Sequence, residues 1–143
     1  MFKTVISAAK LKIILALLSL LLIGGAYTYQ DTGIHNTVTH PDSYTLDIQK
    51  RSDLVYNSVS EVIIQQGKLS PVAYKQTCES SLGFIQGERL DTNTNYNTLD
   101  ADKKELMQGY RTYLKESANV VSAYRAGGIP DLTAMKTAKA ALY

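Results

Sequence analysis

The chain has 143 residues, a formal net charge of +2, ten tyrosines, no tryptophan and one cysteine, Cys78. A single cysteine excludes an internal disulfide framework. Three of the fifteen basic residues precede a long apolar run, and the remaining twelve are balanced by thirteen acidic residues. This balance argues against a nucleic-acid binder, which would present a basic face, and against a polybasic lipid-binding patch.

An uncharged, largely apolar run covers residues 13–29, and Lys3, Lys10 and Lys12 lie on its N-terminal side. As a helix, this run would cover about 26 Å of the roughly 30 Å hydrocarbon core, and the lysines next to it can snorkel to the headgroups. We therefore expect residues 1–29 to form a single transmembrane anchor that contacts membrane lipid through residues 13–29. The lysines predict a cytoplasmic N-terminus, with the rest of the chain outside the cytoplasm.

The same stretch also fits a cleaved signal peptide. Residues 13–23 have the length of a signal-peptide apolar region, and Gly24, Gly25 and Ala26 offer small residues for cleavage after Ala26. Under this alternative, the chain becomes a secreted or periplasmic module without residues 1–26.

Residues 30–42 are polar and rich in Thr and Asn, which is typical of a juxtamembrane linker. The domain that follows, residues 43–143, is expected to be all-α because it contains no convincing alternating stretch. Its first helix is predicted over residues 43–66 and should end at Gly67 in a left-handed conformation. The apolar stripe of this helix consists of Ile48, Val55, Val59, Val62 and Ile63.

Three more helices are predicted after Gly67. Ser70 as N-cap and Pro71 at the first helical position begin a helix that ends near residue 90. The third covers residues 100–126 and ends at the Gly127-Gly128 pair, and the last begins near residue 131. Their apolar stripes consist of Cys78, Leu82 and Ile85 in the second, Leu106, Tyr110, Tyr113, Val120 and Tyr124 in the third, and Leu132, Met135, Ala138 and Leu142 in the last.

Segments 65–75 and 125–136 share one plan: a helix end, glycine, a spacer, Leu or Ile, then proline and a new helix. We therefore expect two helical hairpins that form a small antiparallel bundle of about four helices, or two stacked pairs. The predicted fold is thus an N-terminal transmembrane helix followed by an all-α bundle.

The loop at 91–102 resembles in part an EF-hand calcium loop, or the dockerin-type variant that ends in Asp. Asp91, Asn93 and Asn95 have the 1-3-5 ligand spacing, and Asp102 stands at position 12. Tyr96 stands where the calcium loop needs glycine for its sharp turn. The resemblance implies a calcium site, and the alternative is a solvated turn.

Catalytic candidates are weak, and we expect no enzyme and no cofactor other than calcium. His35 and His40 fall in the predicted linker, away from any rigid element. Cys78 shares an apolar stripe and is expected to be buried. The sequence contains no phosphate loop, no Gly-x-Ser-x-Gly and no zinc-ligand spacing.

The first helix is apolar over a wider arc than three short companions would cover, which favours contact with another protein chain. We expect a partner, either a second copy or a different membrane subunit, to contact Leu54 or Ile64 together with Tyr56, Tyr110 or Tyr113. Core packing is the alternative for the tyrosines of the third helix.

The sequence thus predicts a non-catalytic structural or interaction protein, an accessory subunit of a membrane or cell-surface assembly. The first alternative is a secreted or periplasmic helical module that binds a ligand between its helices. A further alternative is a pilin-like filament subunit, although the apolar run lacks an early acidic residue.

Overall fold

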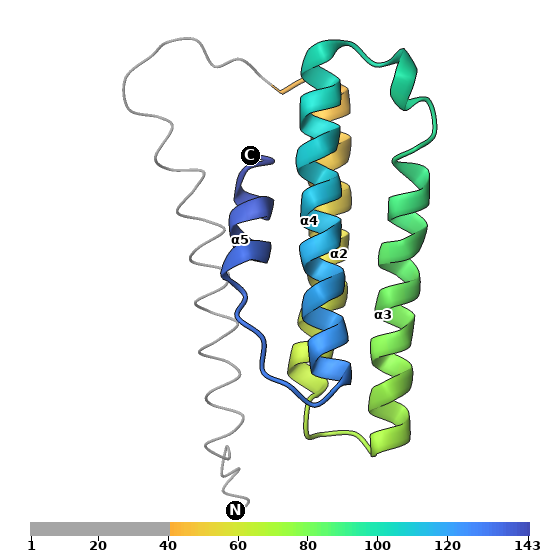
Figure 1. Cartoon of the computed structure of the whole chain (residues 1–143), viewed down its shortest axis with the longest axis vertical. Helices are drawn as coiled ribbons and strands as arrows, with labels where there is room; N and C mark the ends of the chain where they lie inside the picture. Colours follow the sequence, from red (N-terminus) through yellow and green to blue (C-terminus); the bar gives the residue numbers. More distant parts are fainter. Residues whose placement is uncertain (1–40) are drawn as a thin grey trace, which may run out of the picture. The chain divides into compact units, whose positions relative to one another are not determined.

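Figure 1 shows the fold as a computed structural model, which describes residues 41–143. The predicted anchor and nearly all of the predicted linker lie outside the described residues, so both stay predictions. Within 41–143, none of the helices combines the length and the apolarity that a membrane crossing needs.

The described part of the chain is all-helical, with four α-helices and no strand, as the sequence predicts. The elements are α2 (Ser43–Gln65), α3 (Pro71–Asp91), the short 3-10 helix η2 (Tyr96–Thr98), α4 (Ala101–Arg125) and α5 (Thr133–Ala140). Successive long helices α2, α3 and α4 run antiparallel to one another (Figure 1). The four helices do not form two equal hairpins, because α5 is only 8 residues long and α4 packs against all three other helices.

Side-chain caps begin the three long helices, and Ser70 is the N-cap that the sequence predicts. Asp42, Ser70 and Asp100 each accept a hydrogen bond from the backbone N–H three residues later, at 2.8, 3.3 and 2.9 Å. Pro71 occupies the first position of α3. A backbone N–H at this position has no partner within the helix, so the N–H that proline lacks removes no helical hydrogen bond.

Glycines in the left-handed conformation end α2 and α4, as predicted. Gly67 has φ +74° and Gly127 has φ +85°. After α4, the N–H of Gly128 donates to the Ala123 carbonyl at 2.9 Å and that of Gly127 to the Tyr124 carbonyl at 3.0 Å. This pair of bonds is a Schellman motif, which satisfies two carbonyls at the end of the helix.

The predicted stripes form the core, which also contains residues that the stripes leave out. Met107, Leu114 and Val121 of α4 are buried although they lie to one side of the predicted stripe. They are buried because α4 lies among α2, α3 and α5 and therefore buries a wider arc than a helix with one partner. The buried apolar residues are Ile48, Val55, Val59, Val62, Cys78, Ile85, Met107, Tyr110, Tyr113, Leu114, Val120, Val121, Tyr124, Met135 and Leu142.

We expect Gly67→Val to lower the free energy of unfolding by more than ~1 kcal/mol, because a β-branched residue does not adopt positive φ easily. Thermal unfolding of the full-length chain in neutral detergent measures it. The control is Asn57→Ala on the exposed face of α2, which should not lower stability, because alanine favours a helix more than asparagine does. An unchanged midpoint for Gly67→Val would contradict the role of Gly67 as a left-handed cap.

Candidate functional site

The partner surface predicted on α2 is only partly exposed. Leu54 is 49% exposed, whereas Tyr56 and Ile64 are half-buried. Leu54 and Ile64 are ten residues apart, so they are separated by about 15 Å along the helix and about 80° around it. They do not form one continuous apolar patch, because the exposed polar residues Asn57 and Glu61 lie between them on the same side of α2.

Tyr110 and Tyr113, two residues of the predicted partner surface, lie in the core instead. Both side chains are fully buried, so neither is available to a partner chain. The Tyr113 hydroxyl donates to the Ser52 carbonyl at 3.2 Å, and the Tyr110 hydroxyl donates to a carboxylate oxygen of Glu88. Core packing, the alternative for these tyrosines, is therefore what the structure shows, and the cause is the central position of α4.

An ionic cluster that sequence reasoning missed surrounds Tyr110. Arg51 Nε donates to Glu88 at 2.8 Å, and Arg51 Nη2 donates to Asp91 at 2.6 Å. Burial, and then the hydrogen bond to Glu88, raise the pKa of Tyr110 well above its usual range, so its hydroxyl stays protonated and donates. The cluster joins α2, α3 and α4. In the sequence, its one signal is that Arg51 follows the core residue Ile48 by three positions and therefore lies close to the buried face of its helix.

The structure places arginines beside the predicted calcium loop. Asp91 accepts a hydrogen bond from Arg51, and Asn93 accepts one from an α4 arginine at 2.9 Å. Asn95 is in the left-handed conformation, and Asp102 lies in the first turn of α4. Two of the four candidate ligands are thus paired with guanidinium groups, whose positive charge opposes a bound cation. Within residues 41–143, no three His, Cys, Asp or Glu side chains group to hold a metal ion.

The outward face of α3 carries a row of six exposed uncharged residues, which we call the α3 stripe, and the exposed Glu79 lies at the edge of this row. Its members lie three or four positions apart, so they share one face of the helix. They are Val72, Gln76, Ser80, Gly83, Gly87 and Leu90, all exposed. Val72 is 70% and Leu90 is 62% exposed. An exposed helix face normally carries charged side chains, so this one is unusual for a surface in contact with water alone.

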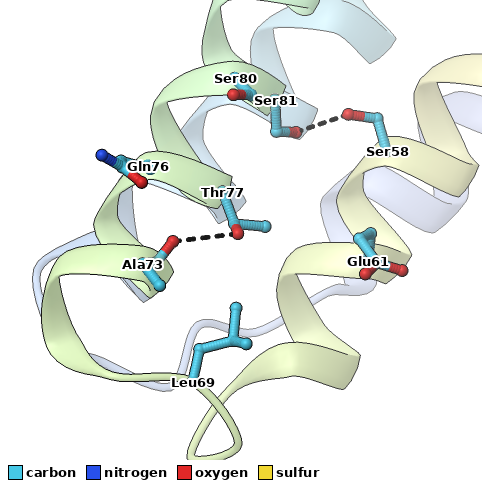
Figure 2. A pocket seen from close by; sticks show the side chains of 8 residues that line it. All are labelled: Ser58, Glu61, Leu69, Ala73, Gln76, Thr77, Ser80 and Ser81. Carbon is cyan, nitrogen blue, oxygen red and sulfur yellow. Dashed lines mark hydrogen bonds between the residues drawn. The ribbon is translucent and has the colours of Figure 1, made fainter.

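An open groove of about 500 Å³ lies beside the stripe, between α2 and α3 (Figure 2). Its lining is small and polar, and consists of Ser58, Glu61, Leu69, Ala73, Gln76, Thr77, Ser80 and Ser81. Ser58 donates to Ser81 at 2.8 Å, and Thr77 donates to the Ala73 carbonyl at 3.1 Å. Several hydroxyls are therefore already used within the domain, and Glu61 is the only ionisable side chain in the lining.

The Ser58–Ser81 bond also shows how α2 and α3 are aligned, and hence which exposed apolar residues of the two helices lie at the same height. In this antiparallel pair, Leu54, four residues before Ser58, lies level with position 85, next to Phe84. Leu54 and Phe84 are both exposed. The exposed part of the predicted α2 surface therefore lies beside α3 rather than alone on the far side of α2.

No protein-family model, no curated protein and no solved structure matches this chain.

We expect Glu88→Leu to lower the free energy of unfolding by about 2 kcal/mol or more, because it removes the acceptor of both Arg51 Nε and the Tyr110 hydroxyl and leaves Arg51 paired with Asp91 alone. Chemical unfolding of full-length protein measures the change. The double variant Arg51→Met/Glu88→Leu should lose less than the sum of the two single variants, since it removes both charges together. Strict additivity would show that the Arg51–Glu88 contact contributes no coupling.

Proposed function

We propose that this chain is a non-catalytic interaction protein held at a membrane by residues 13–29, with domain 43–143 outside the cytoplasm. It would serve as an accessory subunit of a larger membrane or cell-surface assembly. The apolar run with lysines on one flank supports the anchor. The α3 stripe supports the interaction, and it is the observation that carries the proposal.

The two glycines in the stripe do not stabilise their own helix. Each weakens the helix by up to ~1 kcal/mol relative to alanine, and a Cβ added at Gly83 or Gly87 would meet nothing within 4 Å. Small residues on a helix allow the backbone of another helix to approach closely, as glycine pairs spaced by four do between membrane-spanning helices. The glycines are thus accounted for by a partner helix along α3.

The partner that fits the stripe best is α3 of a second copy. If two α3 helices cross antiparallel about a point between positions 81 and 82, Ser80 meets Gly83 and Gln76 meets Gly87. Leu90 then meets Ala73, so at least one of the two facing residues is small in each of these three pairs. A two-fold axis along the membrane normal produces this arrangement and keeps both anchors in one membrane.

The proposed anchor predicts from which side of the membrane an introduced cysteine is labelled. In a Cys78→Ser background, Thr37→Cys should react with a membrane-impermeant maleimide on intact cells, because the positive-inside rule places the linker outside. Ser7→Cys should react only after the membrane is broken. The reverse pattern would overturn the orientation, and an intact mass that lacks residues 1–26 would favour the secreted module.

The contact predicts that Gly87→Leu disrupts self-association without unfolding the monomer, because the new side chain points into open space in its own chain and blocks the second helix. The mass of the full-length protein in detergent, by light scattering, should fall from a dimer to a monomer. Asn119→Leu, which introduces the same leucine side chain on the exposed face of α4, should leave the dimer intact.

Cross-linking of Ser80→Cys in the Cys78→Ser background identifies the partner. A cross-linked homodimer supports the second copy, and a defined larger adduct in membranes would replace it with a different subunit. A strictly monomeric protein that forms no adduct at position 80 would overturn the interaction proposal.

A further inference from the structure

A second hollow, of about 420 Å³, lies between α3 and α4 and has a basic lining. Three of its eight lining residues carry a positive charge and none carries a negative charge. The lining consists of Gln86, Arg89, Leu90, Thr92, Asn93, Arg111, Thr112 and Lys115. The near-neutral charge of the whole domain does not predict such a local excess.

The packing of α3 against α4 places two of these charges on facing helices. Arg89 lies on α3 and Lys115 lies on α4, and both line the hollow. Arg111, four residues before Lys115, lies about one turn away on the same helix. Further along the pair, Arg125 Nη2 of α4 lies 3.7 Å from Glu79 Oε1 of α3.

None of the three charges is neutralised by an acidic neighbour. Every ion pair among residues 41–143 involves other basic residues, and none includes Arg89, Arg111 or Lys115. Like charges that line one hollow repel each other, and an anion between them turns the repulsion into attraction.

Arg111 is held in place by its own neighbours. Its Nε and Nη2 donate to the Oγ1 and carbonyl of the buried Thr92 at 3.3 and 3.0 Å, and Nη2 also donates to Asn93. The guanidinium carbon lies 4.1 Å from the centroid of the Tyr96 ring. A guanidinium fixed in this way loses little conformational freedom when it binds a ligand, so Arg111 forms a preorganised wall of the hollow.

We propose that the α3–α4 hollow binds a phosphate group, with Arg89 and Lys115 contacting it from opposite sides and Arg111 supplying a fixed positive field. A phosphate oxygen accepts charge-assisted hydrogen bonds from both kinds of side chain. The group can belong to a lipid headgroup or to free phosphate. The α3–η2–α4 connection beside Thr92 lies at the same end of the bundle as the start of α2 (Figure 1), and in the sequence α2 follows the predicted linker. The headgroup source therefore rests on the proposed function, whereas binding of free phosphate does not.

The test uses the full-length chain in dodecyl maltoside micelles and follows its thermal midpoint. Inorganic phosphate should raise the midpoint when it replaces sodium chloride at constant ionic strength, because a ligand that binds the folded chain stabilises it. In Arg89→Gln/Lys115→Gln, the apparent affinity should fall by about tenfold or more, since charge-assisted hydrogen bonds are lost. Lys50→Gln/Lys136→Gln removes the same charge elsewhere and should respond as the wild-type chain does.

Mixed micelles distinguish the two sources of the phosphate group. A headgroup site is indicated if phosphatidic acid raises the thermal midpoint of the wild-type chain, whereas free phosphate at the same concentration and phosphatidylcholine do not. Equal stabilisation by both indicates that the phosphate group alone is bound. The proposal is overturned if neither shifts the wild-type midpoint, or if the double variant responds as the wild-type chain does. The inorganic phosphate arm reports on the hollow even if the anchor is not retained.

Discussion

The packing of this domain depends on the backbone of α2, whose carbonyls accept hydrogen bonds from the tyrosine hydroxyls of two neighbouring helices. Tyr113 donates to the carbonyl of Ser52 and Tyr74 to that of Val62, so each hydroxyl joins its own helix to the backbone of α2. A buried hydroxyl without an acceptor would be unfavourable by about 1–3 kcal/mol. A shift of one helix by one turn would break these bonds, and the hydroxyls therefore fix the register that apolar contacts alone would leave less well defined.

This register determines which surfaces remain for binding. Once α4 is surrounded by α2, α3 and α5, the large aromatic side chains are used inside the domain. What remains outside on α3, which buries one side against α2 and α4, is the α3 stripe with its two glycines. The same packing places Arg89 of α3 and Lys115 of α4 at one hollow. Neither feature is a property of one helix alone, since the first depends on which side of α3 is buried and the second on the alignment of two helices.

The parts of the fold that could be predicted are those determined by neighbouring residues. Ser70 followed by Pro71, and glycine at 67 and 127, specify helix ends through local hydrogen bonds and backbone conformation, so the boundaries agree to within about two residues. The parts that could not be predicted depend on what packs alongside. Periodicity places Tyr110 and Tyr113 on the apolar face of a helix, but whether that face meets its own chain or a partner depends on how many helices surround it. The contacts of Arg51 with Glu88, and the closeness of Arg89 to Lys115, join residues far apart in the sequence.

Leu90 connects the two surfaces on α3. It ends the α3 stripe and also lines the basic hollow, so a helix that covers the stripe and a phosphate group in the hollow share this side chain. Two sites that share a residue influence each other, and the coupling free energy is the same in both directions. If a bound headgroup orders Leu90 in the position that a second α3 requires, association tightens at an anionic membrane, and association tightens headgroup binding equally. If the two ligands need Leu90 in different positions, each weakens the other. The sign of this coupling therefore depends on whether the two ligands favour the same position of the Leu90 side chain.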